Sequence, residues 1–270
     1  MVGSAILRKL KKLKFKNIII RSKNDLNLLN QKQTHSFLKK VKPEYVIIAA
    51  ARVGGIKANN NFKSKFIYEN LTIQNNLIHG SYLANVKNLL FLGSSCIYPR
   101  NCKQPIKENY LLTDSLESTN QWYAIAKIAG IKLCESFRKQ YEFDAISLMP
   151  TNLYGPGDNY HPENSHVLPA LLRRFHEAKE AGLSDVRIWG TGKPRRELLH
   201  VDDLAAGLIF LLTVKDPPDW VNLGTGKDQT ILELAGMVKD TVGFKGSISH
   251  DLSKPDGTPV KRLDVTLMDS

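Results

Sequence analysis

Long apolar runs are absent from the sequence, and so is the pattern of a secretion signal. No apolar stretch approaches the roughly 18 residues that a membrane span requires. A signal peptide would have an apolar core near the N-terminus, whereas this segment is studded with Lys9, Lys11, Lys12, Lys14 and Lys16. The sequence therefore predicts a cytoplasmic protein with no membrane partner.

Cysteine is scarce, and the three that are present have no metal-ligand spacing: Cys96, Cys102 and Cys134. A disulfide framework needs paired cysteines, and a zinc site needs clustered Cys or His ligands. Neither is predicted, and we expect no bound metal. Internal repeats and low-complexity linkers are also lacking, so any two parts of the chain should be closely packed.

Acidic residues are outnumbered, with 26 Asp and Glu against 38 Lys and Arg, which gives a net charge of +12 at pH 7. Such a charge can indicate nucleic-acid binding. However, the lysines are spread over most of the expected elements, and no zinc-finger, RNA-recognition or helix-turn-helix pattern is present. We interpret the charge as a solvated surface that also suits an anionic nucleotide substrate, with no nucleic-acid partner.

Helical and extended patterns alternate along the chain. The apolar spacing predicts helices over residues 1–13, through 37–40, and over 68–83, 122–141 and 167–181, and strands over 17–20, 45–51, 89–92 and 145–149. Such alternation is typical of a doubly wound parallel sheet, Rossmann-like, with ligands at the carboxyl ends of its strands. We expect a dinucleotide-binding domain over 1–156 and a smaller substrate-binding subdomain over 157–270.

The expected opening of this fold is missing. A strand and a glycine-rich turn normally seat the dinucleotide pyrophosphate on the first helix. Here Gly3 matches the last glycine of such a turn, and the helix follows directly. We therefore expect a chain truncated at its N-terminus, without the first strand.

A tyrosine and a lysine four residues apart, Tyr123 and Lys127, share one face of the expected 122–141 helix. An ammonium beside a phenol favours the phenolate, so the tyrosine can exchange a proton with a carbonyl oxygen. Upstream, the 89–92 strand opens into Ser94-Ser95-Cys96. Hydroxyls at a strand end, followed by this helix, predict a carbonyl-reducing site.

The segment after the 17–20 strand indicates the cofactor. NAD-preferring enzymes place an acidic residue there to bind the ribose hydroxyls. This chain has Arg21 and Lys23, which suit a 2′-phosphate and favour NADP; two solvated charges are the alternative interpretation.

The loops beyond residue 156 carry turn, basic and aromatic residues at 157–166, 189–197 and 254–259. Arginine and tryptophan side chains can hold a diphosphate and stack on a base or ribose. The stretch 200–206 is interpreted as a capped helix start whose charged residues are structural.

Five motifs resemble those of the GDP-L-fucose synthases, a group of the extended short-chain dehydrogenase/reductases: Val53-Gly54-Gly55-Ile56, Phe91 to Pro99, Tyr123 to Lys127, Pro150 to Pro156 and Asn164-Ser165-His166-Val167. The resemblance runs from Met1 to Asp264. It implies NADPH-dependent 3,5-epimerisation and 4-keto reduction of GDP-4-keto-6-deoxy-D-mannose in a homodimer. Family members continue further at both ends.

The resemblance also implies residue roles. Cys96 and His166 match the epimerising pair, Tyr123 the proton donor in reduction, and Lys127 and Ser94 its supporting residues. Cofactor contacts match Gly3, Lys23, Asn27, Leu28, Leu92, Gly93, Ser94, Ser95, Lys127, Pro150, Thr151, Asn152, Leu153 and His166. Substrate contacts match Arg174, Trp189, Arg196 and Asp256.

Two alternatives remain open. One is another sugar-nucleotide epimerase or dehydratase of the same fold, which has no use for the Cys-His pair. The other is a non-catalytic remnant that binds nucleotide sugar without turnover, which the missing turn favours.

Overall fold

A four-stranded parallel sheet forms the centre of the computed structural model, which describes residues 1–162, 164–254 and 256–269. Its strand order is β1-β2-β3-β7, made of β1 (Tyr45–Ile48), β2 (Asn88–Leu92), β3 (Asp144–Pro150) and β7 (Trp220–Leu223). β2 and β3 are in register from Asn88 opposite Asp144 to Leu92 opposite Leu148. The doubly wound parallel sheet predicted from the sequence is confirmed.

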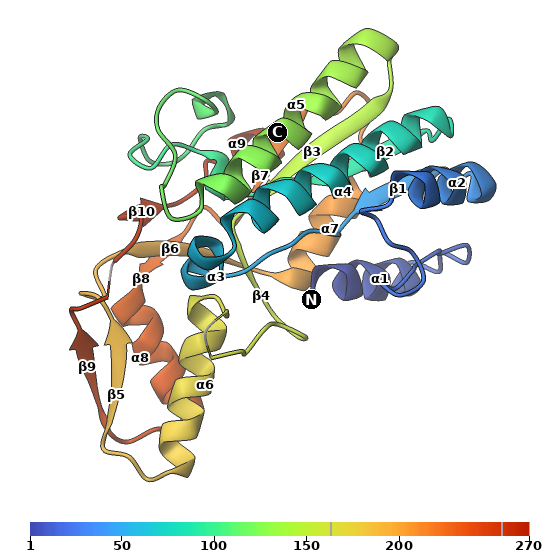
Figure 1. Cartoon of the computed structure of the whole chain (residues 1–270). Helices are drawn as coiled ribbons and strands as arrows, with labels where there is room; N and C mark the ends of the chain where they lie inside the picture. Colours follow the sequence, from blue (N-terminus) through green and yellow to red (C-terminus); the bar gives the residue numbers. More distant parts are fainter. Residues whose placement is uncertain (163, 255, 270) are drawn as a thin grey trace.

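Helices cover both faces of this sheet (Figure 1). One core joins the sheet to α2 (Gln31–Val41), α4 (Lys63–Leu83) and α5 (Gln121–Tyr141), and includes Leu38, Ile78, Phe91 and Ile131. The opposite core joins it to α1 (Val2–Lys12) and α7 (Val201–Leu211), and includes Ile6, Leu90, Leu148 and Leu204. Both faces of β2 are therefore buried, which explains its unbroken apolar run.

Glycine allows α5 to approach the sheet closely. A Cβ added at Gly130 would lie 2.5 Å from the ring of Phe91 on β2. Any larger residue would push the helix outward, and with it Lys127, one turn earlier, and Tyr123, two turns earlier.

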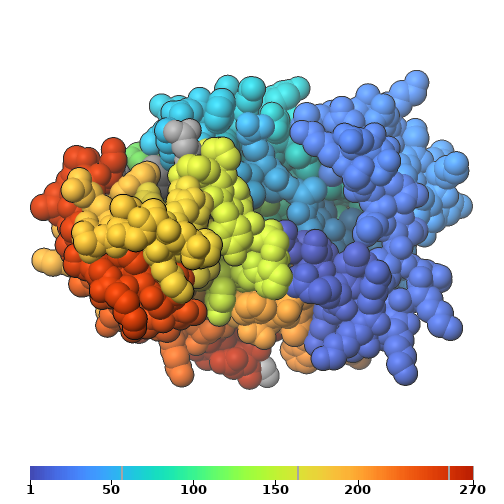
Figure 2. Space-filling model, turned by 90° about the horizontal axis from the view of Figure 1, so that it is seen from below, coloured from blue at the N-terminus to red at the C-terminus, as the bar shows by residue number. Residues whose placement is uncertain are grey.

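A second, smaller layer lies at the other end of the molecule (Figures 1 and 2). It contains α6 (Val167–Glu180), α8 (Ile231–Val242) and the parallel pair β5 (Asp185–Trp189) and β9 (Ser247–Asp251), with Phe175 and Ile188 in its core. Short strands connect the two layers: β4 (Asn152–Tyr154), β6 (Arg195–His200), β8 (Asp228–Thr230) and β10 (Val260–Lys261). The remaining elements are α3 (Ile56–Asn61), α9 (Thr266–Asp269) and the 3-10 turns Ser95–Ile97 and Glu108–Tyr110.

The division at residue 156 stays a prediction. Two elements from beyond it belong to the layers of the four-stranded sheet, since β7 pairs with β3 and α7 is in the core with α1.

His200 caps α7 as expected, because its side chain accepts a hydrogen bond from the Asp202 amide. Asp202 also forms an ion pair with Arg8 on α1, which agrees with the structural role predicted for these charges.

The strand predicted over 17–20 was wrong, because this segment joins no sheet in the described residues. Ile19 and Ile20 are 48% and 63% exposed. A strand needs a neighbour to pair its backbone groups. In the described residues β1 is the edge strand and pairs with β2, so no strand lies between β1 and the 17–20 segment. The predicted 45–51 strand is also shorter, ending at Ile48.

The 189–197 stretch, predicted as a loop, is partly extended. Trp189 ends β5 and Arg195 begins β6, so only the turn between them is irregular. Pairing of β6 with β4, β8 and β10 accounts for the difference, since these contacts come from distant parts of the chain. Glu163 and Pro255, within the other two predicted loops, lie outside the described residues.

Candidate active site

The carboxyl end of β2 carries the first functional side chains. After Leu92 the chain turns at Gly93, whose amide donates to the Leu148 carbonyl at 2.9 Å. Ser94 then caps the short 3-10 turn, with its hydroxyl accepting from the Cys96 amide at 3.2 Å. The strand end therefore places Ser94 and Cys96 together, as the sequence indicated.

Tyr123, in the first turn of α5, reaches this strand end. Its phenol shares a hydrogen bond with Ser94. Burial raises the pKa of Tyr123, the nearby Cys96 raises it further, and the hydrogen bond to Ser94 opposes both. In this structure the phenol is thus held in its neutral, proton-donating form.

Lys127 lies beneath the tyrosine and is only 3% exposed. Its Nζ is 5.8 Å from the centroid of the Tyr123 ring and donates to the Leu92 carbonyl at 2.6 Å. Burial lowers the pKa of Lys127 to about 7. The expected lowering of the Tyr123 pKa by Lys127 is not seen, because burial weakens the positive charge that would cause it.

Cys96 and His166 both lie near one cation, Lys261. The Lys261 Nζ is 3.1 Å from the Cys96 Sγ. Burial raises the pKa of the Cys96 thiol, but the charge of Lys261, hydrogen bonds with Ser94 and Lys261, and the charge of Arg196 outweigh burial and leave the pKa below its ordinary value. The thiolate of Cys96 therefore forms more readily than that of an ordinary cysteine.

His166 stands at the N-terminus of α6 and is open to solvent on one side. Enough protein surrounds its ring for desolvation to lower its pKa; Asp158 opposes this effect and Lys261 adds to it. A protonated His166 in this position gives up its proton more readily than free histidine does.

The predicted substrate contacts form a group on the smaller layer. The Arg174 guanidinium lies 5.1 Å above the Trp189 ring, and Asp256 accepts from the amide and hydroxyl of Thr191 at 2.7 and 2.9 Å. Arg196 connects this group to the catalytic end, since its electrostatic neighbours include both Asp256 and Cys96. Burial lowers the pKa of Arg196.

The predicted cofactor contacts divide into two sets. Gly3 in α1 faces the end of β1, where an added Cβ would be 3.9 Å from that of Ala49. Thr151 and Asn152 follow β3, where their side chains donate to the Glu197 carbonyl at 3.2 and 3.0 Å. With Leu92 to Ser95, these residues surround the carboxyl ends of the parallel strands.

The second set lies in the connection between α1 and α2. Lys23 is exposed, Asn27 accepts from the Leu29 amide, and Leu28 is packed against the α4 core. Within the described ranges, no contact joins these three residues to the catalytic group.

Lys127 provides a test of fit for a dinucleotide. An ammonium has three donors, and in the described part of the chain Lys127 Nζ makes one hydrogen bond, to Leu92. A buried amine with unused hydrogen-bond donors at a strand end fits a ribose hydroxyl. NADP is therefore compatible with the residues present.

Two buried or half-buried residues were missed by sequence reasoning. Glu197 is fully buried and accepts from the amides of Gly226 at 2.8 Å and Leu263 at 2.7 Å. Lys261 contacts Cys96 across 165 sequence positions. Neither lies in a recognisable motif, and only the pairing of β6 with β10 brings them to the site.

One surface depression lies away from this region, at the amino end of β3, and is lined by Arg138, Glu142, Asp144, Asp216 and Pro217. Among the residues that the structure describes, no group of three or more His, Cys, Asp or Glu side chains could hold a metal ion, and no helix is long and apolar enough to cross a membrane.

Comparison with known proteins agrees with this geometry. The NAD dependent epimerase/dehydratase family matches residues 1–224. GDP-L-fucose synthase 1 of Arabidopsis thaliana is 58% identical over 98% of this chain and 82% of its own length. GDP-L-fucose synthase of Escherichia coli is 52% identical over 98% of this chain and 86% of its own length.

Solved structures are similar as well. GDP-mannoheptose C4 reductase from Campylobacter jejuni, with NADP bound, has a TM-score of 0.91 and 41% identity over 99% of this chain and 88% of that one. A GDP-L-fucose synthetase from Naegleria fowleri, also bound to NADP, has a TM-score of 0.89 and 28% identity over 97% and 82%. The chain belongs to the NAD dependent epimerase/dehydratase family, in the group of the GDP-L-fucose synthases.

Proposed function

We propose that this chain converts GDP-4-keto-6-deoxy-D-mannose to GDP-L-fucose, by inverting C3 and C5 and reducing C4 with NADPH. The observation that carries the proposal is the meeting of Ser94, Cys96 and Tyr123 at the end of β2, with Lys127 beneath them. A site that can reduce a ketone lies beside a thiol whose pKa is lowered, so the same sugar can be both inverted and reduced there.

Inversion begins with proton removal next to the ketone. The 4-keto group acidifies the hydrogens at C3 and C5, so each centre needs a base on one face and an acid on the other. The lowered pKa of Cys96 favours this residue as the base. His166, whose pKa is also lowered, is the corresponding acid.

Reduction uses the neighbouring hydroxyls. NADPH, when bound, supplies the hydride for C4. Tyr123 gives its proton to the C4 oxygen, and Ser94 hydrogen-bonds the same oxygen and orients the phenol. Lys127 would hold a ribose hydroxyl of the bound cofactor beside the phenol.

The GDP group occupies the basic and aromatic residues of the smaller layer. Trp189, 43% exposed, offers a face for stacking, and Arg174 stands above its ring. Arg196 is directed toward the catalytic end and suits the diphosphate. A cytoplasmic location and a homodimer are proposed on the resemblance to the family alone.

The function is tested by incubating the chain with GDP-4-keto-6-deoxy-D-mannose and saturating NADPH in heavy water. We expect GDP-L-fucose that carries deuterium at C3 and C5. A product reduced at C4 without deuterium at these carbons would support a reductase only, the activity that the Campylobacter relative's name describes. No consumption of NADPH would contradict both.

Cys96→Ser should separate the two reactions. A serine hydroxyl is far less acidic than a thiol, so it cannot act as the base near neutral pH. We expect deuterium uptake at C3 and C5 to fall by on the order of 10²-fold, measured by mass spectrometry of the recovered sugar. Cys102→Ser is the matched control, and an equal loss in both variants would contradict the assignment.

Cofactor choice should depend on the two cations after residue 20. Arg21 lies 5.2 Å from the Phe37 ring, and Lys23 is exposed, so either can be replaced without unpacking a core. Arg21→Ser with Lys23→Ser should weaken NADPH binding about tenfold and leave NADH binding nearly unchanged, since charge-assisted contacts to the 2′-phosphate are lost. Fluorescence titration measures both, with Lys32→Ser as control; equal losses for the two cofactors would refute the idea.

A further inference from the structure

Lys261 is placed against the sulfur that the proposed epimerisation needs as a base. It ends β10 and stands opposite Arg196 of β6 in the parallel register, with its Nζ 3.1 Å from the Cys96 Sγ. We propose that Lys261 is a positioning residue that holds Cys96 as a thiolate, aimed for proton exchange at C3 and C5. This inference rests on the proposed function.

The charges around the sulfur favour this role. A free thiol has a pKa near ~8.5 and is largely protonated at neutral pH, so a nearby cation is needed for the thiolate. Lys261 and Arg196 are the cations that act on Cys96, from β10 and β6. Tyr123 on α5, whose phenol is neutral, also interacts electrostatically with Cys96, and the charge of Lys261 acts on His166 as well.

Arg196 is not the direct partner of the sulfur. Its Nη1 donates to the carbonyls of Thr258 at 2.6 Å and Arg195 at 2.8 Å, and in the described residues its guanidinium makes no hydrogen bond to Cys96. Arg196 therefore acts on the sulfur through its charge, whereas Lys261 also donates a hydrogen bond to it.

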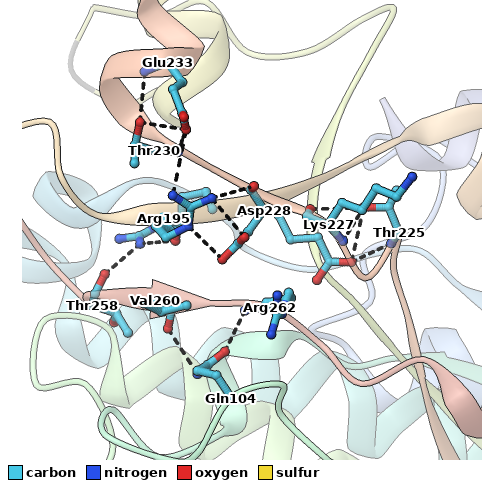
Figure 3. A network of polar contacts seen from close by, with 12 residues as sticks. Gln104, Arg195, Thr225, Lys227, Asp228, Thr230, Glu233, Thr258, Val260 and Arg262 are labelled. Carbon is cyan, nitrogen blue, oxygen red and sulfur yellow. Dashed lines mark hydrogen bonds and ion pairs between the residues drawn. The ribbon is translucent and has the colours of Figure 1, made fainter.

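The backbone that carries Lys261 is held from two sides (Figure 3). On one side, Gln104 donates to the Val260 carbonyl at 3.3 Å and accepts from the Arg262 amide at 3.0 Å. On the other side, the Arg195 amide donates to the Pro259 carbonyl at 2.8 Å.

Buried Glu197 accepts from the Leu263 amide two residues after the lysine. Such support on both sides fixes the ammonium beside the sulfur, as a precise site requires.

The proton balance of the step is simple. The Cys96 thiolate removes the proton from C3 or C5; the C–H bond breaks, an S–H bond forms, and the electron pair becomes the enolate. His166 then delivers a proton to the opposite face. Lys261 stays protonated throughout and gives up no proton.

The first test is the pH dependence of Cys96 alkylation by iodoacetamide, resolved by peptide mass spectrometry so that Cys102 serves as internal reference. Lys261→Met removes the charge at similar length. We expect its Cys96 alkylation rate at neutral pH to fall about tenfold and the midpoint to move upward, because the rate follows the thiolate fraction. Lys261→Arg should keep the low midpoint, and exposed Lys103→Met is the matched control.

Deuterium uptake by the substrate is the second readout. In Lys261→Met the pH midpoint of exchange should move upward with that of alkylation, while Lys261→Arg follows the parent chain. If Lys261→Arg keeps the parent profile, the effect of Lys261→Met comes from the lost charge and not from loss of folding. An unchanged alkylation profile in Lys261→Met would overturn the inference whatever the activity, whereas a shifted profile in a chain that exchanges no deuterium would support the Lys261–Cys96 contact and refute the proposed function.

Discussion

Tyr123→Phe should lose C4 reduction by on the order of 10²–10⁴-fold, the range attributed to general acid-base groups. The phenol shares a hydrogen bond with Ser94, and its raised pKa keeps the proton available for transfer. Phenylalanine keeps the ring and its contact with Phe66, whose centroid lies 6.4 Å away, so folding should be preserved. NADPH consumption at saturating cofactor and substrate measures the effect.

The control for this variant is internal to the reaction. Deuterium uptake at C3 and C5 depends on Cys96 and His166, so it should continue in Tyr123→Phe and the unreduced ketone should accumulate. Tyr68→Phe, at an exposed position on α4, should change neither rate. Undiminished reduction by Tyr123→Phe would show that another group protonates the C4 oxygen.

Much of the fold could be predicted because its signals are local. The apolar runs of β2 and β3 and the spacing in α5 are set by neighbouring residues, and the structure confirms them. Segment 17–20 has the same kind of apolar pattern but pairs with no strand among the described residues, so the pattern did not produce a strand. Pairing is a property of the whole sheet and cannot be deduced from one segment.

The candidate site likewise has residues that the sequence predicts and residues that only the folded structure reveals. Ser94, Cys96, Tyr123 and Lys127 lie in two short motifs, so their proximity was predictable. Lys261 and Glu197 are brought in by β10 and β6, whose pairing joins residues 65 positions apart. The state of Lys127 could not be predicted either, because its pKa depends on burial in the folded chain.

The free edge of β1 should limit the stability of this chain. In the described residues β1 pairs with β2 along one side only. Tyr45 on β1 is exposed, and so are Ile19 and Ile20 between α1 and α2. An unpaired edge with exposed apolar residues promotes association between molecules. We therefore expect the chain to be aggregation-prone. The curated relatives are longer, since the chain covers 82% and 86% of two of them.

Extending the chain before Met1 with a six-residue apolar strand and a glycine-rich turn should raise its stability and its affinity for NADPH. A strand seated on the free edge of β1 would pair with it and offer its other side to the 17–20 segment, while the turn would present amides at the start of α1. Each newly buried apolar side chain contributes about 1.5–3 kcal/mol, against a typical domain stability of roughly 5–15 kcal/mol. We expect the melting temperature to rise by on the order of 10 °C and NADPH affinity by at least tenfold, as measured by calorimetry and fluorescence titration. An extension of equal length with aspartate at the apolar positions is the control; if it performs equally well, or if the unextended chain already melts cooperatively and binds NADPH tightly, the free edge of β1 is not what limits this protein.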